Sequence, residues 1–284
     1  MLSVHGKRGD GFHELTSLMA PLHFGDELEL RATEAGPDVL ECTDDRVPTD
    51  ASNLILRAAA AFRRASGITT NFAFRLKKRI PVGAGLGGGS SNASSTLLAL
   101  NEWFEGPLSP DALTGLAAEL GSDCPFFLSR RPALIGGRGE QIEGLPLSVL
   151  SRLEGQRLLL CYPPFPVETA WAYRRLATSV ENYETAANAR QRLDAFFAGG
   201  EIPDLLFNSF EGPVGEKYLA IPTFLDALRA EGASCLMSGS GSACFILLPA
   251  GTDGARLIEH CRSCWGKDAF CVETSIIGQN DAAR

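Results

Sequence analysis

A glycine-rich run from Pro81 to Ala93, PVGAGLGGGSSNA, constrains the folding of this chain more than any other feature. It lies between a strand expected over 71–79, where apolar and polar residues alternate, and a helix expected over 91–104. Glycine allows positive φ angles and a close approach of the backbone to a ligand, so successive N–H groups can point at one anion. The following helix adds unpaired N–H groups and the positive end of its dipole. The run therefore predicts a loop that binds polyphosphate, rather than a flexible linker.

Two commoner phosphate-binding loops do not fit this run. A P-loop needs the sequence Gly-Lys-Ser/Thr, and the run contains no lysine. The dinucleotide fingerprint needs glycines spaced like Gly83, Gly85 and Gly88, then an acidic residue about 20 residues later at the tip of a second strand. Glu102 and Glu105 instead fall inside or at the end of the expected helix. The sequence thus indicates a different type of phosphate site, with polar side chains at the helix entrance.

Strands and helices are mixed along the whole chain. Strands are expected over 25–33, 71–79, 133–136, 140–143, 157–162, 234–237, 243–248 and 269–274. Helices are expected over 91–104, 110–120 (capped by Ser109), 169–178, 186–197 and 222–230, besides one that Ser52 caps and that ends at Ala65. This mixture indicates an α+β or α/β protein. A fresh pattern begins after residues 146–156, which predicts two domains, 1–150 and 151–284.

The composition excludes several classes of protein. A chain of 284 residues can bury a core, and 26 Lys and Arg against 34 Asp and Glu leave a formal charge of −8. It therefore lacks the broad basic field of a sequence-independent nucleic-acid binder. No apolar run approaches the ~18 residues of a membrane span, and the first residues do not form a signal peptide. We expect a cytoplasmic enzyme without nucleic-acid or membrane partners, whose oligomeric state the sequence leaves open.

The eight cysteines are expected to be reduced and buried. Cys261 and Cys264 form a CxxC pair, but a structural zinc site would need a second Cys or His pair. The pair belongs to the buried stripe expected of an amphipathic helix, Leu257, Ile258, Cys261, Cys264 and Trp265. Free cysteine behaves as a small apolar residue in such a stripe. We therefore assign this pair to the core rather than to a metal or redox site.

The glycine run resembles the ATP-binding motif of the GHMP kinases, small-molecule kinases that include the homoserine and mevalonate kinases. The segment GDGFHEL, residues 9–15, is similar to the fingerprint of the GHMP family that uses ATP to phosphorylate 4-diphosphocytidyl-2-C-methyl-D-erythritol. Segments 121–127, 207–211 and 238–243 agree with that family in the same order. The resemblance implies the two-domain GHMP kinase architecture, with an S5-like N-terminal domain and a ferredoxin-like C-terminal domain.

The resemblance also implies a reaction and the residues that bind ATP. MgATP would phosphorylate the 2-hydroxyl of this cytidine diphosphate substrate, a step of the non-mevalonate route to isoprenoid and terpenoid precursors. The residues implied to bind ATP are Pro81, Val82, Gly83, Ala84, Gly85, Leu86, Gly87, Gly88, Gly89, Ser90 and Ser91, with Asn53 near the adenine. A serine hydroxyl could also face Mg²⁺, whose ligands the sequence does not assign.

Asp123 resembles the catalytic aspartate of the family. As the γ-phosphoryl group arrives, the substrate hydroxyl must lose its proton, and a carboxylate can accept it. From its place after Gly-Ser alone, Asp123 would be interpreted as a helix cap or a turn residue. The glycine run and the histidine-containing segment 9–15 together favour a catalytic base.

The residues implied to bind the cytidine substrate come from three separate segments. They are His13, Phe12, Tyr173, Ser238, Gly239 and Ser240. In the family, the histidine hydrogen-bonds the cytosine, an aromatic residue packs nearby, and a second aromatic residue stacks on the other face of the base. Phe12 stands where Tyr is commoner, so a hydroxyl is lost. Ordinary core packing remains the alternative for Phe12 and Tyr173, and a plain hairpin turn remains the alternative for residues 238–242.

The sequence departs from the family at its beginning. Chains of the family start with a strand that carries Pro-Ala-Lys-x-Asn, whose lysine partners the catalytic aspartate. Residues 2–4 match the end of that strand, so the lysine would fall just before Met1. We expect a true start roughly a dozen residues upstream. The alternatives are a weakened or inactive homologue that regulates by binding nucleotide, and a GHMP kinase for another small molecule.

Overall fold

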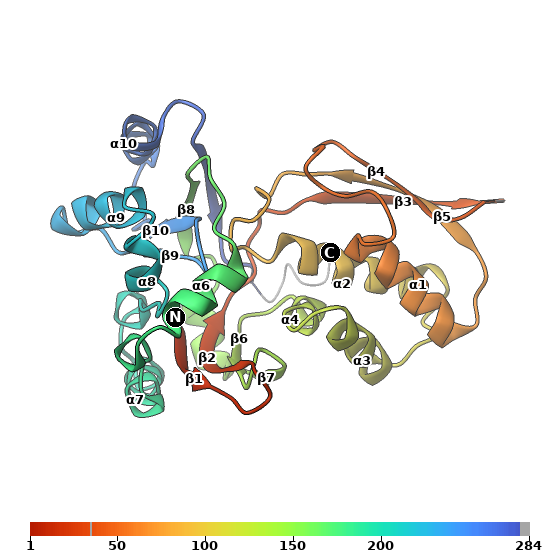
Figure 1. Ribbon diagram of the computed structural model, residues 1–284, viewed down its shortest axis with the longest axis horizontal. Coiled ribbons are helices and arrows are strands. Elements are labelled where there is room, and N and C mark those ends of the chain that lie inside the picture. The colour runs from red at the N-terminus through yellow and green to blue at the C-terminus, as the bar shows by residue number, and fades with distance from the viewer. Residues whose placement is uncertain (35, 279–284) are drawn as a thin grey trace. The chain divides into compact units, whose positions relative to one another are not determined.

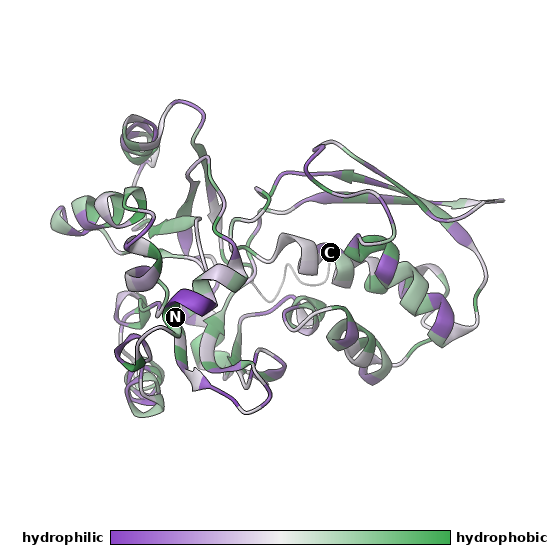
Figure 2. Ribbon diagram, in the orientation of Figure 1, coloured by the Kyte–Doolittle hydropathy of each residue, from purple (hydrophilic) through white to green (hydrophobic). Residues whose placement is uncertain are grey.

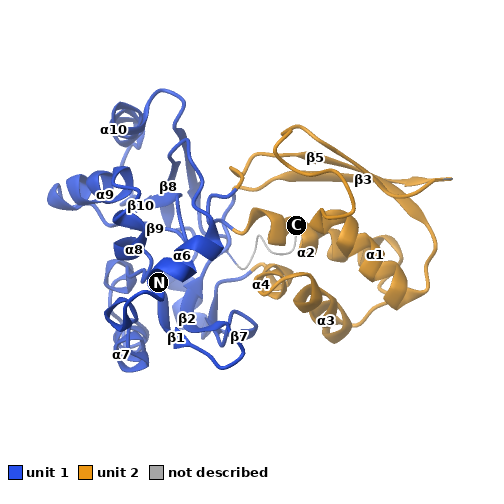
Figure 3. Cartoon of the chain, viewed as in Figure 1, with its two compact units in different colours: residues 1–23, 83–86, 131–284 blue, residues 24–82, 87–130 orange. Residues whose placement is uncertain are grey.

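The computed structural model describes residues 1–34 and 36–278. Its backbone contacts divide the chain into two compact units, which Figure 3 colours separately. Unit 1 comprises Met1–His23, Gly83–Leu86 and Arg131–Arg284, and unit 2 comprises Phe24–Val82 and Gly87–Arg130. Unit 1 is therefore built from both ends of the chain and from a short piece of the glycine run. A linear division at residue 150 follows a different criterion and stays a prediction.

Unit 2 consists of a three-stranded sheet and four helices (Figure 1). In the sheet, the middle strand β5 (Asn71–Lys77) is antiparallel to β3 (Glu27–Thr33) and parallel to β4 (Val39–Cys42). The helices are α1 (Leu54–Ser66), α2 (Gly88–Trp103), α3 (Pro110–Leu120) and α4 (Cys124–Ser129). The apolar residues of β5 that alternate in the sequence are buried, which confirms the predicted half-buried strand.

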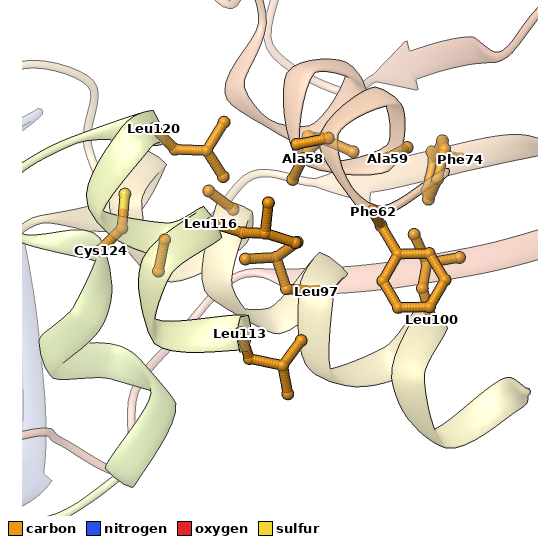
Figure 4. Close-up of a cluster of buried hydrophobic side chains, with 14 of the residues drawn as sticks. Ala58, Ala59, Phe62, Phe74, Leu97, Leu100, Leu113, Leu116, Leu120 and Cys124 are labelled. Atoms are coloured by element: carbon orange, nitrogen blue, oxygen red, sulfur yellow. The ribbon is translucent and has the colours of Figure 1, made fainter. Parts of the chain in front are cut away.

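The core of unit 2 forms where α1, α2 and α3 pack together (Figure 4). Phe62 of α1, Leu97 of α2 and Leu116 of α3 contribute to this cluster, and Cys124 lies at its edge. Full burial of a Leu or Phe side chain stabilises the fold by about 1.5–3 kcal/mol. This core therefore holds the N-terminal ends of α2 and α4 in fixed positions within the unit.

The helix caps of unit 2 partly follow the sequence prediction. Ser109 caps α3 by accepting a hydrogen bond from the Ala112 N–H, as expected. For α1 the cap is Asn53, whose side chain accepts from the Ile55 N–H, while the Ser52 hydroxyl donates to Asp50. The expected Ser52 cap is therefore wrong by one residue. Helix α2 starts at Gly88, three residues before the expected start, inside the glycine run.

Unit 1 contains two four-stranded antiparallel sheets. The first has the order β1 (Leu2–Lys7), β2 (His13–Met19), β6 (Ala133–Gly136) and β7 (Gln141–Gly144). The second has the order β11 (Phe270–Ser275), β8 (Arg157–Tyr162), β10 (Cys244–Leu247) and β9 (Cys235–Met237). Strand β8 has the predicted bounds and is buried from Leu158 to Tyr162, as its continuous apolar run predicts.

Six α-helices accompany these sheets in unit 1, among the residues that the structure describes. They are α5 (Leu147–Leu153), α6 (Thr169–Leu176), α7 (Ala186–Phe197), α8 (Glu211–Gly215), α9 (Ala220–Ala230) and α10 (Ala255–Trp265). Hydrophobic and hydrophilic residues mix along them (Figure 2), because each helix buries one face. In α9 the buried residues are Ile221, Phe224, Leu225 and Leu228. The α+β class expected from the sequence is confirmed.

Helix α10 corrects one expectation. Cys261 and Trp265 are buried, but Cys264 is exposed, so the predicted buried stripe is narrower than the sequence suggested. The eight cysteines are all free thiols, as expected, but only five of them are buried, because Cys42 and Cys271 are half-buried and Cys264 is exposed. Within the described part of the chain, no helix is long and apolar enough to cross a membrane.

Candidate active site

The first half of the glycine run packs against the turn at residues 238–242, within unit 1. The Ala243 N–H donates to the Ala84 carbonyl over 3.0 Å, and the Ser238 hydroxyl donates to the Gly85 carbonyl over 3.2 Å. Gly85 has φ +74°, and a Cβ atom there would lie 2.6 Å from the Ser238 carbonyl oxygen. Gly239, at φ +56°, would meet the Gly85 carbonyl oxygen at 2.7 Å in the same way. Only glycine allows these two turns to lie this close.

The residues of this turn are held by polar contacts from three directions. The Ser240 and Thr169 hydroxyls are 2.9 Å apart, and the Ser242 hydroxyl donates to the Phe165 carbonyl. The Asn208 amide donates to the Gly239 carbonyl over 2.8 Å. Because β9 and β10 pair on either side, the segment is also a hairpin connection. The segment is therefore a hairpin, as the alternative interpretation expected, and it also lies against the glycine run, while its contact with the substrate stays a prediction.

The second half of the glycine run forms the N-terminus of α2, within unit 2. Gly87 is the N-cap at φ +67°, and a Cβ atom there would meet the Phe127 ring at 2.7 Å. In the described chain, the backbone N–H groups of Gly88, Gly89 and Ser90 donate no hydrogen bond, whereas the Ser91 N–H donates to the Gly87 carbonyl. Three unpaired donors at the positive end of a sixteen-residue helix suit a phosphate group.

A buried ion pair fixes the start of α2 to the end of strand β5. The Lys78 ammonium lies 2.5 Å from the Asp26 carboxylate, and the two side chains are 8% and 1% exposed. Asp26 also accepts from the Asn92 amide at 2.9 Å and from the N–H groups of Arg79 and Ile80 at 2.8 Å. A Cβ atom on Gly88 would lie 3.1 Å from the Lys78 nitrogen, so this cation lies beside the first turn of α2.

Asp123 lies at the N-cap of α4, but its carboxylate makes no capping hydrogen bond. Within the described residues its side chain has neither a hydrogen-bond partner nor an ion pair, so it does not cap the helix, although the residue does lie in the turn before α4. Its side chain is open to solvent, yet the surrounding protein excludes enough water to raise the pKa of the carboxyl group. A free carboxylate with a raised pKa can accept a proton.

Helix α2 holds Asp123 in place through the next residue along the chain. The buried Ser94 hydroxyl donates to the Cys124 carbonyl over 2.6 Å. Burial raises the pKa of the Cys124 thiol. Helix α2 and the residue that follows Asp123 are therefore joined directly inside unit 2.

His13 and Tyr173 lie together in unit 1. Their ring centroids are 4.8 Å apart and tilted by 34°, and Tyr183 approaches His13 from 6.0 Å. Phe210 packs edge-on against Tyr173 at 4.8 Å. The His13 Nε2 atom is buried without a hydrogen-bond partner among the described residues. Burial, with the positive charge of Lys7, lowers the pKa of His13, which leaves the ring neutral at pH 7.

Phe12 does not pack in the core, so that alternative is excluded. Its side chain is 47% exposed, and the Arg138 guanidinium lies 4.6 Å from the ring centroid. The Asp10 carboxylate accepts from the Phe12 N–H over 3.1 Å and fixes the turn between β1 and β2. An exposed aromatic ring backed by a cation offers a flat surface to an aromatic ligand.

Asn53, predicted to lie near the adenine, makes its hydrogen bonds to neighbouring residues of the chain. Its side-chain oxygen caps α1, and its amide donates to the Pro48 carbonyl over 2.6 Å. Both polar atoms of the side chain are therefore used within the fold. Its predicted contact with adenine stays a prediction.

Comparison with known proteins decides the family. The sequence model of the GHMP kinases N terminal domain matches residues 53–131, and that of the GHMP kinases C terminal matches residues 193–267. The 4-diphosphocytidyl-2-C-methyl-D-erythritol kinase of Methylacidiphilum infernorum is 40% identical over 248 residues, which are 87% of this chain and 82% of the relative. That of Deinococcus radiodurans is 40% identical over 93% of this chain and 87% of its own length. The chain belongs to the 4-diphosphocytidyl-2-C-methyl-D-erythritol kinase family.

Solved structures agree with this family. A crystal structure of 4-(cytidine 5'-diphospho)-2C-methyl-D-erythritol kinase covers 96% of this chain and 95% of its own, with TM-score 0.76 and 34% identity. Homoserine kinase from Cytophaga hutchinsonii has TM-score 0.71 over 98% of this chain and 94% of its own, but only 18% identity, and so shows the fold alone. The GHMP kinase architecture expected from the motifs is therefore confirmed.

Several residues around the site of this kinase could not be predicted from the sequence. Ser94 links α2 to Cys124, and Lys78 lies beside the first turn of α2. Tyr183 and Phe210 surround the His13–Tyr173 pair. Phe210 lies in segment 207–211, which resembles the family, and Lys78 belongs to the basic run before the glycines. Ser94 and Tyr183 carry no local signal, because only the folded chain brings them to their partners.

Proposed function

We propose that this chain transfers the γ-phosphoryl group of ATP to the 2-hydroxyl of 4-diphosphocytidyl-2-C-methyl-D-erythritol. The bond between the γ-phosphorus and the β,γ-bridging oxygen breaks, a bond from that phosphorus to the substrate oxygen forms, and ADP leaves. The hydroxyl proton passes to Asp123. The observation that carries the proposal is the unpartnered Asp123 carboxylate. The carbonyl of the next residue, Cys124, accepts a hydrogen bond from Ser94 of α2, the helix that begins with three free N–H donors.

ATP phosphates bind, in this proposal, to the backbone of the glycine run. The N–H groups of Gly88, Gly89 and Ser90 and the positive end of α2 stabilise the negative charge. The Lys78 ammonium adds a cation beside the first turn, although Asp26 neutralises part of its charge. A net charge of −8 is compatible with this mode of binding, because N–H donors carry no formal charge.

Positioning and electrostatics supply most of the catalysis in phosphoryl transfer. Asp123 must be ionised to accept the hydroxyl proton, and its lack of partners leaves both carboxylate oxygens available. The hydroxyls of Ser90 and Ser91 are oxygen donors of the kind that Mg²⁺ prefers. Bound with ATP, Mg²⁺ would neutralise part of the phosphate charge.

The cytidine end of the substrate is recognised by unit 1. A neutral His13 has one ring nitrogen that donates and one that accepts, and its unpartnered Nε2 can complete a hydrogen bond with the polar edge of a base. Tyr173 and Phe12 offer aromatic faces for stacking, which contributes about 1–3 kcal/mol per base in single-strand nucleic-acid binders. Ser238, Gly239 and Ser240 lie against the glycine run and serve the substrate phosphates. We place the reaction in the cytoplasm.

The test is phosphoryl transfer from ATP, measured with this substrate, homoserine and mevalonate in parallel. It uses the chain as printed and a version extended upstream by its own coding DNA. Transfer to the cytidine substrate alone is expected. Transfer to another alcohol would overturn the substrate, and ATP binding without transfer in both versions would overturn the catalytic function.

The Asp123→Asn variant tests the base. Turnover should fall by about 10²-fold or more, as for general bases, with the Kd for ATP within a few-fold of the parent. Asp111→Asn is the matched control, because Asp111 is an exposed carboxylate in the first turn of α3 in the same unit. Equal turnover in the two variants would contradict the role of Asp123.

A further inference from the structure

Three cysteine thiols converge inside unit 1, in a cluster that the kinase function does not use. The Sγ atoms of Cys161, Cys261 and Cys271 all lie within 4.8 Å of one another. They come from three different elements, β8, α10 and β11. Cys161 and Cys261 have no exposed surface, and Cys271 is half-buried. We call these three residues the thiol triangle.

The sheet register explains how the thiol triangle forms. Cys161 of the inner strand β8 lies directly opposite Cys271 on β11, and on its other side lies directly opposite Cys244 on β10. Residues that are directly opposite in antiparallel strands point to the same face of the sheet. Cys261 of α10 reaches Cys161 and Cys271 on this face. The side chains of two strands and one helix therefore bring three sulfur atoms together.

The dimensions of the thiol triangle match those of a metal site. Thiolates bound to a metal ion at about 2.3 Å lie about 4 Å from one another. The sulfur atoms of the triangle, within 4.8 Å of one another, lie close to that spacing. A disulfide requires just two sulfur atoms, so the presence of the third thiol at the same point favours a metal ion over a redox pair.

The ligand set also selects the kind of metal ion. Soft thiolate ligands select Cu⁺ or Zn²⁺. Zn²⁺ is almost always bound by four ligands in structural sites. Among the described residues, no histidine or carboxylate joins the three sulfur atoms, and two of the three are closed to solvent. Cu⁺ is satisfied by three sulfur ligands.

We propose that the thiol triangle binds one Cu⁺ ion through the sulfur atoms of Cys161, Cys261 and Cys271. Three S–H bonds break, three Cu–S bonds form, and the three protons pass to the solvent. No electron is transferred, so the reaction needs neither an oxidant nor a reductant. The site is independent of the phosphate and cytidine binding proposed above.

The experiment titrates the reduced full-length chain with Cu⁺ held by a colorimetric chelator of known affinity, without oxygen. One equivalent of Cu⁺ should transfer to the parent chain. Cys161→Ser and Cys261→Ser should each weaken the affinity by more than tenfold. Cys235→Ser is the matched control, because Cys235 is also a buried cysteine of the same sheet and lies outside the triangle. Its affinity for Cu⁺ should equal that of the parent.

X-ray absorption of the Cu⁺-loaded parent chain tests the ligands without any substitution. Three sulfur neighbours at a single distance are expected. Nitrogen neighbours would indicate binding at the exposed pair Cys264 and His260, which are 3.7 Å apart, and would overturn the proposal. So would tighter binding of Zn²⁺ than of Cu⁺, a disulfide within the triangle, or transfer of one equivalent to Cys261→Ser at the parent affinity.

Discussion

Replacement of Gly85 by alanine tests whether the glycine run is built for close packing. The new Cβ atom would lie 2.6 Å from the Ser238 carbonyl oxygen and 2.8 Å from that of Gly241, and both obstacles are backbone atoms that cannot rotate away. The left-handed conformation of Gly85, at φ +74°, adds a cost of roughly 1–2 kcal/mol for alanine. The turn at 238–242 must therefore move away from the run.

The movement also weakens two hydrogen bonds, Ala243 to Ala84 and Ser238 to Gly85. Each contributes about 0.5–1.5 kcal/mol, so with the backbone cost the local contact loses about 2–5 kcal/mol. A loss of 2 kcal/mol corresponds to a factor of about 30 in an equilibrium constant. Amides that these contacts protect should exchange with solvent at least that much faster.

Hydrogen–deuterium exchange measured by mass spectrometry on the peptide that contains residues 238–243 reads this contact directly. Gly89→Ala is the matched control, because a Cβ atom there meets only Leu54 Cδ1 at 3.6 Å, in a helix where alanine is favoured over glycine by about 1 kcal/mol. Its exchange over 238–243 should match the parent. Equal exchange in Gly85→Ala and Gly89→Ala would refute the reasoning.

Three further predictions concern the site. The pKa of Asp123 is raised and the base must be ionised, so kcat should fall as the pH is lowered, beginning at a pH above the usual pKa of an aspartate. A kcat that stays constant down to that usual pKa would contradict the role of Asp123 as the base. Tyr173→Ala should raise the KM for the cytidine substrate by about 5–150-fold, because stacking contributes about 1–3 kcal/mol, and should leave the KM for ATP unchanged. An equal rise in both KM values would indicate a general disturbance of the fold instead. Lys78→Met leaves Asp26 buried without its cation and should cost about 3–5 kcal/mol of unfolding free energy, measured by urea denaturation; Lys77→Met, which breaks an exposed pair, should cost less than about 1 kcal/mol.

Elements with a strong local pattern could be predicted to the residue. Helix α3 has Ser109 as its cap and a proline in its first turn, and α7 and β8 also have their predicted bounds. The low helix propensity of glycine predicts a later start for α2 than the structure has. The helix starts earlier because the close packing around Gly87 and Gly88 overrides this propensity. Strands β1 and β2 have few apolar residues and form through their pairing, which a local pattern does not show.

Of the site, too, only the residues with a local sequence pattern could be predicted. The glycine run, Asp123 and His13 could be named because each lies in a recognisable segment of sequence. What holds Asp123 is a hydrogen bond between residues 94 and 124, and the partner of Asp26 is Lys78, so neither contact has a local signature. For Cys264 the local pattern was present but misleading. It has the helical spacing of a buried residue, yet it is exposed, because an apolar residue at that spacing need not face the core.

The discontinuous course of unit 1 has a consequence for the order of folding. During synthesis, β1 and β2 leave the ribosome before unit 2 does, but Ser17 of β2 pairs with Ile135 of β6, and the sequence of unit 2 lies between them. Closing so long a loop costs chain entropy before any pairing repays it. Unit 2 is nearly continuous in sequence and can collapse on its own helices first, which shortens the loop. A ribosome-bound nascent chain should therefore protect α1 and α2 from proteolysis before it protects β2.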